Sequence, residues 1–376
     1  SGIARAAMGP AYGASPVLSG QAGQLPQFIL AYDAGSFTYT STYLELTASN
    51  FVGEERFPGK HMFVQSLSWQ PPLEGLELSL YQTSVWGGRF DLNYFVPFSF
   101  LFYNQSLNGF EDNSLLGGAL QYDFPKGISY KTVGYVDDAD FNKLVRLDFG
   151  GKSKLVWDNR ISLTPLQRWM RRLELSYTII TPYMYTHKGD RFVHDNYDNS
   201  WELENKVADI EEYYKTILEG EPNYKNYTHA GDSLGVQLKP NSDHLSLKYH
   251  ARPFPGFLVM LGGSYTRHAN ATQDLKGTYD SNPGAFTEPG SIYDDGYNDD
   301  RRPGFNSGVG FLDQSPMERT AKAEGTLGYT RSFGSHQFAV AGTLIYSHTE
   351  NAGLVKNETE NSLHGLISLI YQVRLW

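Results

Sequence analysis

The sequence predicts an all-β chain folded as an antiparallel β-barrel that spans a membrane. Three observations support this fold class: apolar and polar residues alternate along many segments, those segments are long, and short turns alternate with long loops. Side chains of a strand point alternately to its two faces, so such a segment can meet lipid on one face and a polar lumen on the other. We therefore expect short periplasmic turns, long extracellular loops and one helix within a loop.

The last segment, 363–375, shows the alternation most clearly. One face carries apolar or small residues: Leu363, Gly365, Ile367, Leu369, Tyr371, Val373 and Leu375. The other carries His364, Ser368, Gln372 and Arg374, with Leu366, Ile370 and Trp376 as apolar exceptions. The pattern recurs at 244–250, 257–268, 320–333 and 338–346. Tyrosines at the ends of the apolar faces are suited to an interfacial girdle.

Segment length separates this barrel from a soluble β-sandwich, which also alternates. Many segments run for about 10–14 residues, whereas soluble strands average about 5–6 and tilted membrane strands need about 9–11. The long loops fall at 187–229, 269–317 and 349–362. We count about 15 segments, although bacterial single-chain barrels have an even number. The odd count implies a missed strand, a wrongly divided strand or a missing N-terminal piece. It depends most on the segment 87–112, whose Pro97 cannot donate to a ladder.

Composition excludes several other classes. The 376 residues are 14% aromatic, yet their mean hydropathy is -0.42, as suits a wall with one apolar and one wet face. A net charge of -10 without a basic stripe argues against nucleic acid as a partner. The chain has no cysteine, so disulfides and cysteine-based metal sites are excluded. It also lacks the run of about 18 apolar residues that a transmembrane helix needs.

These features place the chain in the outer membrane of a diderm bacterium, surrounded by lipid and lipopolysaccharide. The sequence begins at Ser1, so it is either a processed mature chain or a fragment that lacks upstream residues. We expect residues 1–25 to form an N-terminal segment, continuing from upstream chain in the second case, and 26–376 to form a single barrel. Within the loop 187–229, apolar residues from 201 to 219 repeat at helical spacing. This pattern predicts a helix that either stabilises the loop or acts as a lid.

An ordered set of short motifs resembles the Wzi-type capsule-assembly barrels. The motifs begin with Gly9-Pro10, Ser15-Pro16-Val17-Leu18 and Leu25-Pro26-Gln27-Phe28, and continue with Tyr94 to Pro97, Asn104-Gln105, and Asp112-Asn113-Ser114-Leu115. Later members are Tyr183 to Thr186, Asn226-Tyr227-Thr228-His229, Leu234-Gly235 and Pro240-Asn241-Ser242. The resemblance implies a largely plugged barrel of roughly 16–18 strands that binds glycan at its outer mouth. The loop 269–317 has no counterpart in it.

Two loops carry residues suited to sugars, because aromatic faces stack on sugar rings and Asp and Asn share hydroxyl hydrogen bonds. The glycan-binding candidates are Tyr279, Tyr293, Asp294, Asp295, Tyr297, Asn298, Asp299, Asp300, Tyr197 and Trp201. The alternative is a pair of solvated surface loops without a ligand. The acidic oxygens could also hold Ca²⁺, although they lack the spacing of an EF-hand; otherwise we expect no cofactor and no metal.

The lumen-lining candidates carry both signs of charge: His244, Lys248, Lys322, Glu324 and Arg374. They suit either a water-filled pore or cross-links within a plugged lumen. His244 and Ser246 share a strand face, faintly like the His-Ser arrangement of outer-membrane phospholipase, but no third catalytic group is visible. The first hypothesis is therefore a non-enzymatic barrel that binds or tethers surface polysaccharide. The alternative is a diffusion porin for small polar or ionic solutes. The sequence does not predict an oligomeric state.

Overall fold

The computed structural model describes residues 2–9, 15–48, 59–107, 112–138, 146, 154–164, 170–185, 225–269 and 310–373. Fourteen strands form one sheet in the order β1-β4-β5-β6-β7-β8-β9-β10-β11-β14-β15-β16-β17-β18. Every pair of neighbours in this sheet is antiparallel. The predicted all-β fold class is confirmed.

The strands of the large sheet are β1 (Gly2–Ala4), β4 (Leu25–Ala34), β5 (Phe37–Leu46), β6 (Lys60–Trp69), β7 (Leu76–Gly87), β8 (Asn113–Phe124), β9 (Ile128–Asp138), β10 (Lys154–Leu163), β11 (Met170–Ile180), β14 (Ser242–Ala251), β15 (Phe257–Ala269), β16 (Met317–Phe333), β17 (His336–Glu350) and β18 (Thr359–Val373). Two small sheets pair β2 (Ala7–Met8) with β3 (Leu18–Ser19) and β12 (Thr228–His229) with β13 (Asp232–Ser233). The helices described are η1 (Leu92–Phe95), α1 (Leu101–Leu107) and η3 (Ala352–Leu354). None of the described helices is long and apolar enough to cross a membrane.

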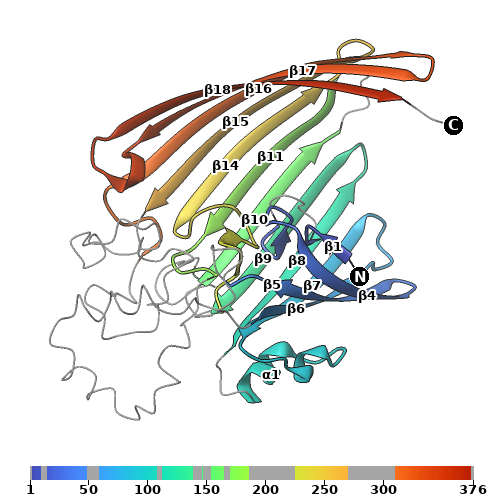
Figure 1. Ribbon diagram of the computed structural model, residues 1–376, viewed down its shortest axis with the longest axis vertical. Helices are drawn as coiled ribbons and strands as arrows, with labels where there is room; N and C mark the ends of the chain where they lie inside the picture. Colours follow the sequence, from blue (N-terminus) through green and yellow to red (C-terminus); the bar gives the residue numbers. More distant parts are fainter. Residues whose placement is uncertain are drawn as a thin grey trace.

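The sheet is a strongly curved wall that bends from the red C-terminal strands at the top of Figure 1 to the blue N-terminal strands below. β1 and β18 are its two edges, and within the described residues no ladder joins them. Short turns connect the strands at one end, as between β14 and β15, while the long connections all leave from the other end. This segregation agrees with the predicted periplasmic turns and extracellular loops.

The segment after β7, on which the predicted strand count depended most, is not a strand. It forms η1 and α1, and the chain rejoins the sheet only at Asn113. Pro97 lies between these two helices, where no ladder hydrogen bond is required of it. The 14 strands described are thus fewer than the roughly 16–18 that the resemblance implies. The predicted helix at 201–219 lies outside the described residues.

The two faces of the wall have the chemistry that the alternation predicts. In the β17–β18 ladder Val340 pairs with Leu369 and Tyr346 with Leu363, all on the outer face. Leu369 is 79% exposed, so no described part of the chain covers it. The alternate residues face inward, as where Thr343 pairs with Leu366. The apolar exceptions Leu366 and Ile370 therefore lie on the inner face.

Glycines allow two of the short turns to pass very close to the backbone of the neighbouring strand. Gly127 and Gly256 both have positive φ, which L side chains rarely adopt. An added Cβ would lie 2.1 Å from the Thr164 carbonyl oxygen at Gly127 and 2.4 Å from the Thr330 carbonyl oxygen at Gly256. Larger residues at either turn would push adjacent hairpins apart.

The facing of β18 can be tested with one charge placed on each side. Leu369→Arg puts a cation in hydrocarbon at a cost of about 2–4 kcal/mol near the midplane, and we expect a strongly reduced yield of folded protein in outer-membrane fractions. Ser368→Arg is the matched control, because Ser368 faces inward and pairs with Ala341. Equal yields of the two variants would contradict the assigned faces.

Candidate functional site: a lumen shared by an apolar plug and a polar hollow

The inner face of the N-terminal half of the wall is covered, near its extracellular end, by three parts of the chain. We call these parts the plug: residues 5–9 with 15–24, residues 181–185 just after β11, and residues 225–238. They form one apolar cluster with the wall strands β5 to β11. Wall members include Leu44, Met62, Val64, Val85, Leu115, Val133, Val156 and Ile180; plug members include Val17, Leu18, Ala22, Tyr227, Leu234 and Val236. Each Val, Leu, Ile or Met among them stabilises the packed state by about 1.5–3 kcal/mol when fully buried, so the lumen along the extracellular ends of β5 to β11 is a dry core.

Three buried tyrosines hold the plug together. Tyr185, just after β11, stacks on Tyr227 with ring centroids 5.0 Å apart. Their hydroxyl groups donate to the carbonyl oxygens of the N-terminal segment, Tyr185 to Pro16 at 2.7 Å and Tyr227 to Val17 at 2.6 Å. Burial raises the pKa of both Tyr185 and Tyr227 well above its ordinary value, so both stay protonated donors. Tyr135 from β9 completes the group, with its hydroxyl 3.4 Å from that of Tyr227.

A fully buried lysine fixes the plug to the wall. Lys60 opens β6 and is 0% exposed. Its ammonium group has three protons to donate, and it contacts Asn226 Oδ1 at 2.8 Å, the Thr228 carbonyl oxygen at 2.9 Å and Thr228 Oγ1 at 3.2 Å. Because an unpaired buried charge is very costly, this geometry ties residues 226–228 to one position on β6.

His229 makes a second connection between plug and wall. Its Nδ1 accepts a hydrogen bond of 3.1 Å from the Thr47 backbone N–H, just beyond β5. Burial is the largest effect and lowers the pKa of His229. In decreasing order, a hydrogen bond to the Gln24 backbone raises this pKa, the nearby Lys60 lowers it and Asp232 raises it. The imidazole is therefore neutral at pH 7, as its acceptor role requires.

Removing one tyrosine hydroxyl tests the plug packing. Tyr227→Phe takes away a buried donor to the Val17 carbonyl oxygen, and we expect the free energy of unfolding to fall by about 1–3 kcal/mol, measured by urea titration in detergent. Tyr32→Phe is the control, since the side chain of Tyr32 is 63% exposed on the outer wall, and it should change stability by less than about 0.5 kcal/mol. A Tyr227→Phe variant as stable as this control would show that the described contact contributes nothing.

The His229 contact predicts acid sensitivity. The pKa of His229 is lower in the folded chain than the ordinary value of about 6.5. The unfolded chain therefore binds the proton more tightly, so this stabilisation is complete above about pH 6.5 and is lost as the pH falls below it. His229→Asn keeps an acceptor for the Thr47 N–H but cannot titrate. We expect it to lose less stability than wild type between about pH 6.5 and 5; identical slopes would exclude His229 as the cause.

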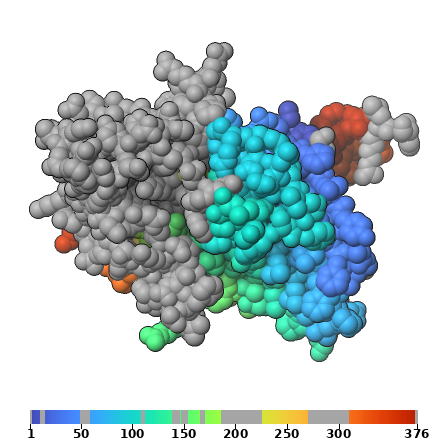
Figure 2. Space-filling view, turned by 90° about the horizontal axis from the view of Figure 1, so that it is seen from below, coloured from blue at the N-terminus to red at the C-terminus, as the bar shows by residue number. Residues whose placement is uncertain are grey.

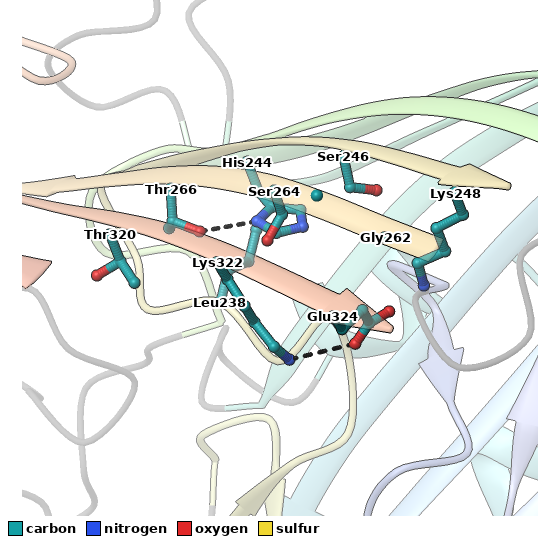
Figure 3. A pocket seen from close by; sticks show the side chains of 11 residues that line it. Leu238, His244, Ser246, Lys248, Gly262, Ser264, Thr266, Thr320, Lys322 and Glu324 are labelled. Carbon is teal, nitrogen blue, oxygen red and sulfur yellow. Dashed lines mark hydrogen bonds and ion pairs between the residues drawn. The ribbon is translucent and has the colours of Figure 1, made fainter. Parts of the chain in front are cut away.

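The C-terminal half of the wall instead presents a polar hollow on its inner face. This hollow of about 220 Å³ is lined from β14, β15 and β16 (Figure 3). The structure brings four of the five predicted lumen-lining residues together here: His244, Lys248, Lys322 and Glu324. Arg374 lies outside the described residues.

The charges of the hollow are only partly neutralised within it. Lys322 Nζ lies 3.7 Å from the Glu324 carboxylate, with both side chains about two-fifths exposed. The side chain of Lys248 is exposed and turns into the same hollow (Figure 3). Next to it on the inner wall, Arg160 pairs with Asp158 at 2.8 Å and with Glu174 at 3.4 Å. The hollow therefore suits polar or anionic solutes more than apolar ones.

The His-Ser pair within the hollow does not have the geometry of a nucleophile and its base. The His244 ring nitrogen Nδ1 hydrogen-bonds Thr266 Oγ1 at 2.8 Å. Ser246 Oγ bonds Ser176 Oγ, also at 2.8 Å. A nucleophilic serine needs a base within hydrogen-bond reach, and the partner described for each residue is a different hydroxyl.

The loops that carry the predicted glycan contacts are held at their bases. Residues 186–224 connect Tyr185 to 225–229, so both ends of this loop lie in the plug. At the second loop, Asn241 accepts the Leu312 backbone N–H at 2.9 Å and donates to Gln314 at 2.7 Å. Its backbone oxygen also accepts the Ala269 N–H at 3.0 Å. Each loop is thus attached to a buried, hydrogen-bonded base.

All ten predicted glycan-binding residues lie outside the described residues: Tyr279, Tyr293, Asp294, Asp295, Tyr297, Asn298, Asp299, Asp300, Tyr197 and Trp201. The acidic group considered for Ca²⁺ belongs to them. Within the described ranges, no group of three or more His, Asp or Glu side chains is arranged to hold a metal ion.

Sequence reasoning missed Lys60 and the roles of Tyr185, Tyr227, His229 and Asn241. A signal was present, because several motifs that carry the resemblance coincide with these contacts. They include Ser15 to Leu18, Tyr183 to Thr186, Asn226 to His229 and Pro240 to Ser242. Without coordinates, nothing in the sequence says that these distant motifs meet inside the wall.

No family model matches the chain, and no curated protein matches it. Among solved structures it is similar to Wzi of Escherichia coli, described as an outer-membrane protein involved in group 1 capsule assembly and a carbohydrate-binding β-barrel. That match has a TM-score of 0.53 at 11% identity and covers 99% of this chain and 67% of the other. OccD3 (OpdP) of Pseudomonas aeruginosa matches at a TM-score of 0.47 and 12% identity, over 94% of this chain and 69% of that one. The chain has the fold of an outer-membrane β-barrel.

Proposed function

We propose that the chain is a non-enzymatic barrel of a diderm outer membrane that binds surface polysaccharide at its extracellular end. The observation that carries this proposal is the plug, which fills the inner face at the extracellular ends of β5 to β11 with apolar side chains. A diffusion channel needs a continuous wet path, and a dry core at the extracellular end of these strands removes much of it. A barrel that presents loops to a polymer outside needs no such path.

Two further features support a binding role. The loops with sugar-compatible residues leave from the same end of the wall, and both are attached to buried bases at Tyr185–Tyr227 and at Asn241. Loops whose ends are fixed lose less entropy when they bind a ligand. The likeness in fold to Wzi, whose description names it as carbohydrate-binding, is in keeping with this role.

The second candidate function is diffusion of small polar or ionic solutes. The hollow at Lys248, Lys322 and Glu324 favours it, because exposed charges of both signs on an inner wall are typical of a water-filled passage. In that case the passage would run along β14 to β16, beside the plug.

Single-channel conductance in a planar bilayer separates the two functions. We expect an inserted but silent barrel, because the plug fills the lumen at the extracellular ends of β5 to β11. The paired variant Lys248→Gln and Lys322→Gln removes both cations of the hollow and serves as the comparison. Steady open steps whose anion selectivity falls in this variant would establish the porin function instead.

Glycan binding is tested by retention on immobilised capsular polysaccharide. Deleting residues 275–302 removes eight of the ten glycan-binding candidates, and we expect retention to fall at least several-fold while folding is kept. Lys356→Ala is the control at the same end of the wall, in the described connection before β18. Unchanged retention after the deletion would show that this loop is only a surface loop.

A further inference from the structure

Residues 88–107, here called the outer strap, fold back over the lipid-facing side of the wall. They contain η1 and α1, which lie beneath β6 in Figure 1 and form a continuous raised patch of cyan atoms beside the blue strands in Figure 2. The strap covers outward positions of β5, β6 and β7, such as Phe63, which is 4% exposed. An extracellular loop therefore occupies part of a surface that is bare on β17 and β18.

The side of the strap that faces the wall is polar at its centre, and its polar groups are paired. Gln65 and Gln82 oppose each other in the β6–β7 ladder at outward positions. Gln82 Nε2 donates to the Ser99 carbonyl oxygen at 2.6 Å and to Gln65 Oε1 at 3.2 Å, while Gln82 Oε1 accepts the Leu101 N–H at 2.9 Å. Gln65 Nε2 donates to the Val96 carbonyl oxygen at 3.3 Å.

This pairing has a physical reason in a membrane. A glutamine side chain that faces hydrocarbon has no water to bond, and each unsatisfied group costs several kcal/mol. The strap supplies the missing partners, and Gln65 is only 2% exposed beneath it. Aromatic contacts close the edges, with Trp86 stacked on Tyr94 at 4.5 Å and Tyr39 stacked on Phe98 at 4.1 Å between ring centroids.

The side of the strap that faces away from the wall is apolar. From residue 92 to residue 107 the chain carries no Asp, Glu, Lys or Arg. Its exposed residues are Leu92, Asn93, Val96, Pro97, Phe98, Phe100, Phe102, Tyr103 and Leu107, of which only Asn93 and Tyr103 carry a polar side-chain group. The charged residues of the strap, Arg89 and Asp91, lie at its start, where Arg89 also pairs with Asp112 beside β8. A loop in water would present the opposite arrangement, with polar groups outward.

The strap is continuous with the apolar outer wall. The next outward pair along β6 and β7 after Gln65 and Gln82 is Leu67 and Leu80. These two leucines line an apolar hollow of about 510 Å³, together with Phe37, Trp69, Leu78 and Leu120. On the other flank, β4 exposes Phe28, Leu30 and Tyr32 on the same face. Strap and bare wall thus form one uncharged surface.

We propose that the outer strap is seated in the membrane, with the acyl chains of outer-leaflet lipid covering its exposed aromatic side. The strap is then an interfacial lipid anchor that also caps the two polar residues of the wall. This inference rests on the membrane placement proposed above and is independent of glycan binding. A second copy of the chain would cover the strap only in patches, whereas lipid meets all of the wall around it.

Site-directed nitroxide labelling tests the proposal directly, because the wild-type chain has no cysteine. Phe98→Cys and Phe102→Cys place labels at strap positions that are 66% and 44% exposed. Phe98→Cys gives up the ring contact with Tyr39, so Phe102→Cys is measured beside it as an independent position. Leu369→Cys is the control for bare wall and Lys356→Cys is the control for water. The proteins are reconstituted at high dilution in phosphatidylcholine vesicles, and collision of each label with oxygen and with a water-soluble nickel chelate is measured.

We expect the oxygen-to-nickel collision ratio at positions 98 and 102 to match that at 369 and to exceed that at 356 at least several-fold. A ratio like that at 356 would place the strap in water and overturn the proposal. Labels that neither reagent reaches, with spin–spin broadening between copies, would assign the surface to a second copy and also overturn it. If the collision ratio at position 369 is itself as low as that at 356, the bare wall is in water and the proposed membrane placement is wrong. That outcome differs from one in which only the labels on the strap have a low ratio.

Discussion

A strand that crosses a membrane meets lipid at every second residue, and any polar group on that face needs a partner within the protein. The long hairpins of β16, β17 and β18 satisfy this constraint with their own ladders and bare apolar faces. Strands β6 and β7 do not, because Gln65 and Gln82 interrupt their outer face. The chain meets the constraint there with an excursion that brings backbone groups of residues 96–101 to both glutamines.

The polarity of the inward side chains differs between the two halves of the wall. Between β14 and β16 it is hydrophilic, and exposed Lys248 and Lys322 stand where water would hydrate them. Near the extracellular ends of β5 to β11 the inward residues are apolar, so water is a poor neighbour there and the plug replaces it. The polar contacts inside this dry core are few and specific: Lys60 binds 226–228, and two tyrosines bind the backbone near residue 16. An apolar inner face therefore goes together with a segment that covers it.

The sequence predicted those features that depend on one strand at a time. Alternation placed Leu369 outward and gathered His244, Lys248, Lys322 and Glu324 on one face, because a period of two is local. It did not settle the segment 87–112, an aromatic-rich run that packs as two short helices over a neighbouring surface. The plug could not be predicted, since Lys60 meets Asn226 across 166 positions, and only the fold brings them together. Lys60 would ordinarily be assigned to solvent.

In the N-terminal half, plug, wall and strap form three layers. In the C-terminal half the wall is a single sheet, with lipid on its outer face and water on its inner face. This asymmetry determines where loops can be held. The loop between β11 and β14 starts from Tyr185 and ends at 225–229, both inside the plug, so its two ends are fixed by the stacked tyrosines and by Lys60. The loop between β15 and β16 has only a polar clamp at Asn241. Of the two loops, the first therefore has the more rigid base, and a ligand that bridges both would be positioned chiefly by the plug.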